Sequence, residues 1–200
     1  MSEMLNEFKE KRKAGHKIQD IILHRWSPRA MTGEEIPDEE LMSLFEAARW
    51  APSSYNNQHW RFIYAKRNTP HWDLLFNLMG DWNKMWAKNA AVLLVIISKN
   101  TFDHNGNPAR THAFDTGAAW ENLALEGSAR GLVVHGMEGF DYDKAKKDLE
   151  IPDGYEVHAM AAIGKFAPKE TLEDAKMRER DVPSERRPLK EIIMEGKFKP

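Results

Sequence analysis

The run AVLLVIIS at residues 91–98 constrains the fold of this chain more than any other segment. A strand with one face in water alternates apolar and polar side chains, whereas this run is apolar until its last residue. Such a strand needs cover on both faces, so we expect it at the centre of a sheet that lies between helices. The run is also far too short to cross a bilayer.

Helix and strand patterns alternate along the rest of the chain. Apolar residues at helical spacing predict helices over residues 38–51, 70–79, 81–88, 113–130 and 142–149. Short apolar runs between turn residues predict strands over residues 60–65, 133–135 and 157–164. A looser apolar stripe from Ser2 to Leu23 predicts one helix, or two divided at Gly15. The expected class is therefore mixed α and β.

Length and composition favour one domain over residues 1–200, with a helical N-terminal extension (1–20) and a charged, Pro-punctuated C-terminal arm (165–200). A formal net charge of −2 gives no overall field that would attract nucleic acid or an anionic membrane, so neither is an expected partner. The first residues lack the apolar stretch of a secretory signal, and we expect a cytoplasmic protein.

The residue types and motifs that the sequence lacks narrow its chemistry. Because the sequence contains no Cys, disulfides, thiolate metal sites and a cysteine nucleophile are excluded. Its histidines lack the i, i+4 spacing that marks a zinc-binding helix, so no metal site is expected. Neither a nucleophile elbow nor a Walker-type loop is present.

The segment HRWSPR places Arg25, Ser27 and Arg29 at alternating positions. Pro28 favours an extended Ser27, and alternate side chains of an extended segment point to one side. Two guanidiniums that flank a hydroxyl form a good receptor for a phosphate. A solvated basic turn is the alternative, and it is the commoner use of three such residues.

Three further stretches carry polar groups suited to a ligand. PSSYNNQHW (52–60) offers short hydrogen-bonding side chains, although Ser, Asn and Pro are also generic turn formers. GMEGF (136–140) follows a strand, and its glycines allow the main chain to approach a ligand closely. SERRP (184–188) could add positive charge to a distant phosphate site or be a solvated charged pair.

Taken together, these stretches resemble the FMN-dependent nitroreductase family in order and spacing, from about Ile21 to Ile193. RWSPR is similar to its Arg-x-Ser-x-Arg phosphate motif, and APSSYNNQHW to its Pro-Ser-Ser-x-Asn-x-Gln-Pro-Trp segment. DTGAAWENLALEGSARGL is similar to its long central helix, and GMEGFD to a loop of the family. The resemblance departs from the family pattern at His59, at Trp26 and at Ser184.

The resemblance implies a three-layer α+β fold, with a central mixed, mostly antiparallel sheet flanked by helices, in an intertwined homodimer. Two FMN molecules would lie in clefts built by both subunits. One subunit would hold the phosphate, the ribityl chain and the pyrimidine edge of the flavin, and the Ser/Asn turn would come from the other subunit. The Glu138–Gly139 backbone would face flavin N5. Lys84 would lie near flavin O2. The cofactor-binding residues implied are Arg25, Trp26, Ser27, Arg29, Pro52, Ser53, Ser54, Asn56, Lys84, Glu138, Gly139 and Arg186.

The implied activity is transfer of a hydride from NADH or NADPH through flavin N5 to a small electron-poor acceptor, such as a nitroaromatic or a quinone, by a ping-pong reaction. In this reading the protein supplies no catalytic side chain, because the cofactor carries the chemistry. Trp82, Trp86 and Trp120 are candidates for the substrate side, with packing as the commoner role. The alternative function is flavin storage or redox sensing without significant turnover.

Overall fold

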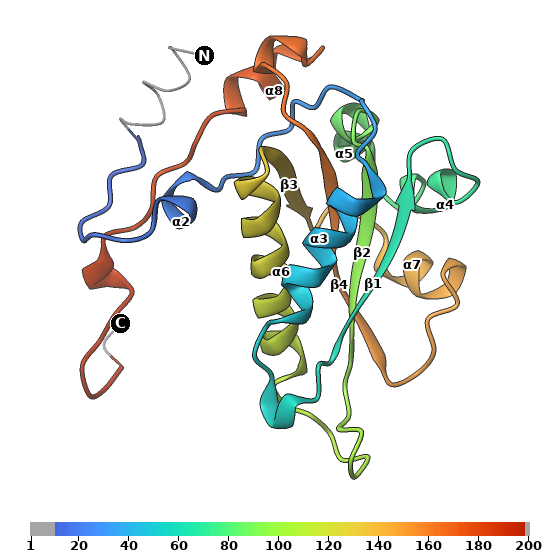
Figure 1. Ribbon diagram of the computed structural model, residues 1–200, viewed down its shortest axis with the longest axis vertical. Coiled ribbons are helices and arrows are strands. Elements are labelled where there is room, and N and C mark those ends of the chain that lie inside the picture. The colour runs from blue at the N-terminus through green and yellow to red at the C-terminus, as the bar shows by residue number, and fades with distance from the viewer. Residues whose placement is uncertain (1–10, 199–200) are drawn as a thin grey trace.

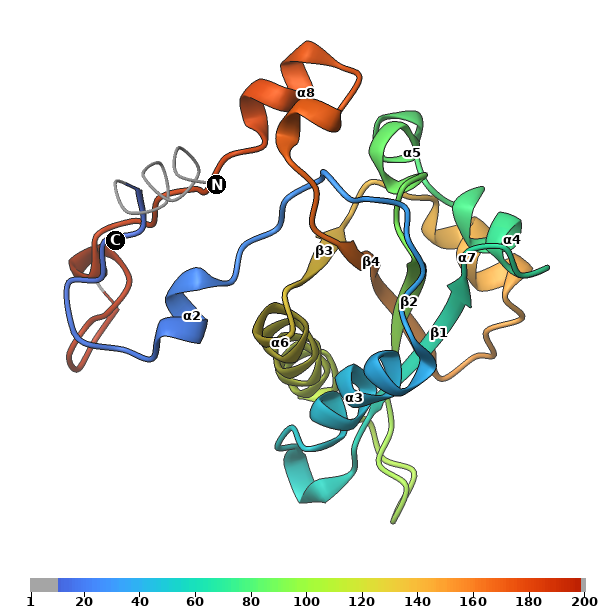
Figure 2. The same cartoon turned by 45° about the horizontal axis from the view of Figure 1, so that its top comes forward.

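The computed structural model describes residues 11–198, which form a four-stranded sheet between two layers of helices (Figure 1 and Figure 2). The strands are β1 (Trp60–Lys66), β2 (Val92–Lys99), β3 (Leu132–Met137) and β4 (Tyr155–Lys165). They lie in the order β1-β2-β4-β3, and all three pairings are antiparallel. The apolar run therefore forms a central strand, as its composition predicted.

Alternate side chains of β2 pack into two separate cores. Val92, Leu94 and Ile96 contact the layer formed by α3 (Asp38–Arg49) and α6 (His112–Ala129). The side chains between them contact the opposite layer, formed by α4 (Trp72–Phe76), α5 (Asp81–Ala87) and α7 (Tyr142–Asp148). Cover on both faces explains why the strand has no polar face, and it confirms the expected three-layer α+β class.

The structure differs from the sequence expectations at the chain ends. In the N-terminal extension, residues 1–10 lie outside the described part, and residues 12–19 form no helix before the short α2 (Asp20–His24). Residues 12–19 carry mostly polar side chains around Gly15, so there is no continuous stripe to bury. The helix expected over 70–79 is shorter, because only residues 72–76 are helical.

The C-terminal arm contains a helix that was not predicted, α8 (Ala175–Arg180). The Asp174 carboxylate caps it by accepting a hydrogen bond from the Met177 amide at 2.8 Å, and the Met177 side chain is buried in the core. Farther on, the arm is extended apart from the single 3-10 turn Leu189–Glu191, as expected for an arm.

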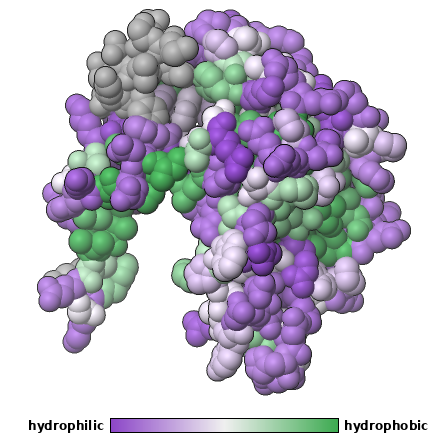
Figure 3. Space-filling model, in the orientation of Figure 1, coloured by the Kyte–Doolittle hydropathy of each residue, from purple (hydrophilic) through white to green (hydrophobic). Residues whose placement is uncertain are grey.

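The arm and the N-terminal segment run side by side, away from the sheet (Figure 1 and Figure 2). Figure 3 shows apolar side chains gathered over α2 and the end of the arm. Ile192 and Ile193 are each 59% exposed, and Ile22 is 52% exposed. A group of exposed branched side chains on adjacent segments is typical of a surface that contacts another protein chain.

We predict that Leu94→Ala destabilises the protein by about 2–5 kcal/mol, because it leaves a cavity beneath α3 and α6. Leu94 is fully buried on the central strand. Leu74→Ala is the matched control, since Leu74 on α4 is 39% exposed and its truncation opens no internal cavity. Urea denaturation measures both free energies of unfolding. Equal losses in the two variants would contradict the assigned core.

Candidate functional site

The segment between α2 and α3 holds the predicted phosphate residues, and Arg25 is its best-anchored side chain. The Arg25 Nη1 donates to Ser27 Oγ at 3.3 Å, so these two side chains meet as the alternating pattern predicted. The Arg25 Nε lies 3.3 Å from a carboxylate oxygen of Glu121 on α6. This ion pair fixes the guanidinium beside the long helix, and Trp26 next to it is partly buried.

Arg12 brings a further guanidinium to this place, and the sequence analysis did not identify it. Arg12 is buried, which lowers its pKa, and the nearby positive charges of Arg186 and Arg25 lower the pKa further. Arg186 comes from the C-terminal arm, where its Nη1 donates to Ser184 Oγ at 2.9 Å. Arginines from both ends of the chain therefore lie near enough to Arg25 for their charges to act on one another, an arrangement suited to a multiply charged anion.

Asp181 holds the backbone of this segment against the C-terminal arm. Its carboxylate accepts the amide of Arg29 at 2.7 Å and that of Ala30 at 3.3 Å, and Arg29 Nη1 lies 3.7 Å away. Burial raises the pKa of Asp181, more than the two amides and the Arg29 charge lower it. The segment is thus fixed by the buried Asp181 carboxylate, which accepts the amides of Arg29 and Ala30 and has the Arg29 guanidinium nearby.

The end of β3 forms the shared wall of two adjacent cavities. One, of about 470 Å³, contains Arg29, Glu138 and Gly139, so three of the predicted cofactor residues line a single hollow. The other, of about 320 Å³, lies against α6. Gly136, Met137 and Glu138 line both. The chain at the end of β3 therefore lies between the two cavities, and a flat ligand in either cavity would contact it.

His135 connects this wall to the arginine segment. Its Nδ1 hydrogen-bonds the Pro28 carbonyl at 3.0 Å, so the ring donates through this nitrogen. Burial lowers the pKa of His135 to about 4, and the positive charges of Arg29 and Arg25 also act to lower it. At neutral pH the ring is therefore uncharged and adds no positive charge to the cavity that it lines.

The α6 side of the smaller cavity carries a polar group that the sequence analysis also missed. Thr116 is buried, and its Oγ1 has no hydrogen-bond partner among residues 11–198. A buried hydroxyl without a partner is costly, so this atom, in a residue that lines the cavity, would gain from a polar ligand atom that reached it. Trp120 lines this cavity and Trp82 the larger one, whereas Trp86 is buried in the core and serves packing.

The Ser/Asn turn lies apart from these groups within one chain. It packs on the first turn of α6, where the Ser54 amide donates to Asp115 Oδ2 at 3.0 Å (Figure 1). Its backbone is unusual, because Tyr55 and Asn56 have φ values of 53° and 51°. None of Pro52, Ser53, Ser54 and Asn56 lines either cavity at the end of β3, and Lys84 on α5 does not line them either.

His59, which stands where the resembled family has proline, supports the turn from below. The ring is fully buried, with its Nδ1 3.0 Å from the Lys99 carbonyl and its Nε2 3.8 Å from the carboxylate of Asp115. Asp115 in turn accepts the Ser54 amide. The departure from the family pattern therefore places a buried polar ring beneath the turn, near the acid that accepts the Ser54 amide.

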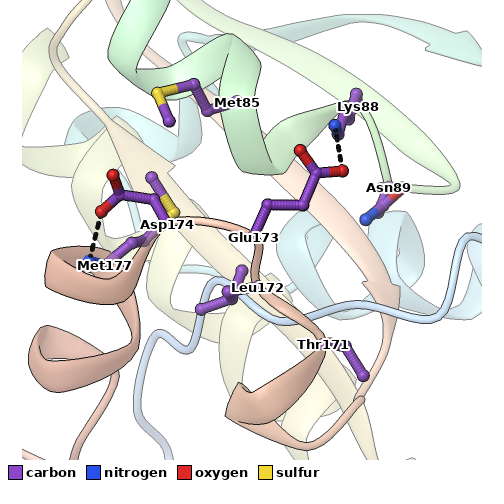
Figure 4. Close-up of a pocket in the computed structure, with 8 residues that line it drawn as sticks. All are labelled: Met85, Lys88, Asn89, Thr171, Leu172, Glu173, Asp174 and Met177. Atoms are coloured by element: carbon purple, nitrogen blue, oxygen red, sulfur yellow. Dashed lines mark hydrogen bonds and ion pairs between the residues drawn. The ribbon is translucent and has the colours of Figure 1, made fainter.

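A third hollow, between α5 and the start of α8, is too small for a cofactor (Figure 4). It encloses about 60 Å³, and the ion pair between Lys88 and Glu173 at 2.7 Å crosses one side. Within residues 11–198 no three His, Asp or Glu side chains group to hold a metal ion. No helix in that same range is long and apolar enough to span a bilayer.

We predict that Asp181→Ala lowers the free energy of unfolding by about 1–3 kcal/mol, because the amides of Arg29 and Ala30 then lose their buried acceptor. Glu185→Ala is the control, since Glu185 is an exposed carboxylate in the same arm. Guanidinium denaturation provides the measurement. If both variants lose less than about 0.5 kcal/mol, Asp181 does not hold the segment.

The lowered pKa of His135 predicts a pH dependence of stability. The unfolded chain, with the ordinary pKa of 6.5, binds this proton before the folded chain does, so the free energy of unfolding falls as pH is lowered from 6.5 to about 4. His135→Gln should remove that part of the slope, whereas His16→Gln at an exposed position should retain it. Thermal unfolding at stepwise pH checks both; an unchanged slope in His135→Gln refutes the assignment.

Comparison with known proteins agrees with this geometry. The nitroreductase family model matches residues 22–71 and 70–165. A crystal structure described as an oxidoreductase containing FMN is 43% identical, with a TM-score of 0.90, over 94% of this chain and 96% of that one. Protein DrgA of Synechocystis sp. is 30% identical over 78% of this chain and 84% of its own length.

A Bacillus subtilis protein, MhqN, provisionally named an NAD(P)H nitroreductase, is 25% identical over 68% of this chain and 81% of its own length. The two matched stretches of the family model together cover the arginine segment, the Ser/Asn turn and the loop after β3. From the sequence resemblance, the three-layer fold and these matches, the chain belongs to the nitroreductase family.

Proposed function

We propose that this protein is an FMN-dependent oxidoreductase that passes a hydride from NADH or NADPH to a small electron-poor acceptor, such as a nitroaromatic or a quinone. The observation that carries the proposal is that Arg12, Arg25 and Arg186 lie near enough to act on one another by charge, while Arg29 of the same segment as Arg25 lines the larger hollow at the end of β3. One segment therefore connects a group of positive charges, suited to a phosphate, with a cavity that could take a ring. The similar oxidoreductase that contains FMN supports the same cofactor here.

The residues present fit FMN at both of its ends. Arg25, Ser27 and Arg29, with Arg12 and Arg186, are suited to the phosphate, since guanidiniums bind phosphate in pairs of parallel hydrogen bonds. The Glu138 and Gly139 backbone offers polar groups to the ring. Thr116 lines the smaller cavity, and its buried hydroxyl, which has no partner among residues 11–198, would gain one from a ligand atom that reached it.

The complete site, in this proposal, needs a second copy of the chain. Pro52, Ser53, Ser54 and Asn56 line neither cavity of their own chain, although they form a strained polar turn suited to a ligand. The exposed apolar side chains of α2 and the arm give such a second copy a surface to cover. A homodimer in which each turn reaches the partner's cofactor accounts for both features.

In the mechanism that we propose, bound FMN supplies hydride chemistry, and the chain binds, orients and surrounds it. Arg29 lines the larger cavity as a permanent cation, and with Lys84 as a second candidate it would favour a cofactor that gains negative charge on reduction. His135 stays neutral there, so it does not add to this effect. The apolar walls around Ile96, Trp120 and Met137 exclude water from the ring face.

We predict that the double variant Arg25→Ala plus Arg29→Ala purifies without colour. Loss of two charge-assisted contacts to phosphate should weaken FMN binding by about 100-fold or more. Arg61→Ala is the control, because Arg61 on β1 lines neither cavity at the end of β3 and donates to the backbone carbonyls of Gln58 and Trp60. Absorbance of the purified proteins near 450 nm, roughly where an enzyme-bound flavin absorbs, measures the loading. A yellow double variant would show that the phosphate assignment is wrong.

The enzyme and the storage or sensing alternative differ in turnover. We expect NADH or NADPH to bleach the flavin absorbance of the purified protein within seconds, and a quinone or nitroaromatic to restore it, as a redox cofactor in use requires. Anaerobic stopped-flow absorbance measures both half-reactions. Failure of both nucleotides to bleach the flavin would favour storage or sensing over the proposed activity.

A further inference from the structure

A cluster of polar side chains, outside the cofactor residues discussed above, lies under the N-terminal end of α6. The Ser98 hydroxyl is 2.7 Å from His112 Nδ1 and 2.6 Å from His158 Nε2. His112 Nε2 lies 3.7 Å from a carboxylate oxygen of Glu156, which is 52% exposed. Two hydrogen bonds therefore join the two rings through a hydroxyl, and an exposed acid lies near the outer nitrogen of His112.

The backbone places His158 in this cluster by an irregularity of the sheet. Ile96 pairs with Ala159 and Ile97 with Val157, so His158 is the extra residue of a β-bulge in β4. A bulge re-aims the side chain of the extra residue. Here it brings the ring to Ser98, which is fully buried and follows Ile96 on the face of β2 that α6 covers.

His158 also lines the cavity of about 320 Å³ between β2, β4 and α6. That cavity shares Glu138 with the larger hollow, so it adjoins the place where the loop after β3 would contact a cofactor. The second ring nitrogen, Nδ1, has no hydrogen-bond partner among residues 11–198. One nitrogen of the ring thus faces the Ser98 hydroxyl, and the other is available to a ligand.

We propose that His158 is the proton donor to the reduced acceptor in this cavity, and that Ser98 and His112 reload it from the side of Glu156. The inference rests on the proposed function and names a residue for it. An acceptor that receives a hydride at an oxygen- or nitrogen-bearing group needs a proton to complete the reduction. Among residues 11–198, the other polar side chains that line this cavity are those of Thr116, Trp120 and the exposed Glu138.

The transfer balances as a sequence of proton movements. As the Nδ1–H bond of His158 breaks and a new O–H or N–H bond forms on the acceptor anion, His158 Nε2 takes the proton of the Ser98 hydroxyl, so the imidazole stays neutral throughout. In the same movement the Ser98 oxygen takes the Nδ1 proton of His112, and His112 gains a proton on Nε2 from solvent at the side of Glu156. After the product leaves, the reverse movement restores the first tautomers: His158 Nδ1 takes a proton from water in the cavity and His112 Nε2 returns one to solvent. Each step breaks one bond to hydrogen and forms one, so no further oxidant or reductant is needed.

The charged groups around His158 suit this task. Burial lowers the pKa of His158, the nearby His112 lowers it further, and Glu156 on the same strand raises it. From α7, the Tyr142 hydroxyl donates to the His158 carbonyl at 3.2 Å, which fixes the backbone and leaves the ring free. The ring is therefore neutral near pH 7. It carries its proton on Nδ1, and can donate from there, only if Nε2 accepts the hydrogen bond of the Ser98 hydroxyl.

The first test is the tautomer of His158 in the purified holoprotein. Nitrogen-15 chemical shifts of the imidazoles should show His158 protonated at Nδ1, the less common form in free histidine, because Nε2 accepts from Ser98. Ser98→Ala should return His158 to the Nε2-protonated form. An Nε2-protonated ring in the unaltered protein, or no change in Ser98→Ala, would overturn the relay. This measurement needs no turnover.

The second test separates the two half-reactions by anaerobic stopped flow. His158→Gln should slow reoxidation by a quinone by roughly 100-fold, within the range of general acid catalysis, and should leave flavin bleaching by NADH or NADPH within twofold. His71→Gln, at an exposed position before α4, is the matched control and should change neither rate. Reoxidation at the unaltered rate in His158→Gln overturns the proposal.

The outcomes also separate this proposal from the proposed function. If neither nucleotide bleaches the flavin of the unaltered protein, the oxidoreductase assignment fails. If bleaching and reoxidation both proceed but His158→Gln reoxidises normally, the relay alone fails. Should His158→Gln purify unfolded by circular dichroism, the tautomer of the unaltered protein still decides the matter.

Discussion

A buried carboxylate joins the two ends of this protein. Asp181, late in the chain, accepts the amides of Arg29 and Ala30, early in the chain, and it is almost completely withdrawn from water. Much of the arginine site is built around this contact. It fixes the extended backbone of RWSPR, it sets Pro28 so that its carbonyl meets His135 on β3, and it starts the arm on the course that brings Arg186 to Arg12 and Arg25.

The core could be predicted from the sequence because hydrophobic burial leaves a local signal. The apolar run of β2 and the apolar stripes of α3 and α6 each indicate which faces of these elements must be buried, and those faces are buried in the structure. The chain ends carry no such signal. Residues 12–19 have too few apolar side chains to specify a helix, and α8 depends on one cap, Asp174, and one buried residue, Met177.

The candidate site could be predicted only in part, for a similar reason. Arg25 and Ser27 are two positions apart, so their meeting is local and visible in the sequence. Arg12 lies outside any motif, and its role depends on the folding of the whole chain, which brings the C-terminal arm back to the N-terminal segment. Thr116 sits among small residues of a long helix, and its unpaired hydroxyl is a property of packing. The contact between Ser98 and His158 depends on a bulge that no spacing rule indicates.

The convergence of Arg12 and Arg186 has a consequence for how the protein becomes functional in a cell. Contacts between residues so far apart in sequence form late, because a long loop must close before they are made. A nascent chain still on the ribosome has not yet released the segment that carries Arg186, and so it lacks part of the anion site that we assign to the cofactor phosphate. Capture of the flavin would then follow release of the segment that carries Arg186, and proteolytic loss of that segment would reduce retention of the flavin while the sheet stays intact.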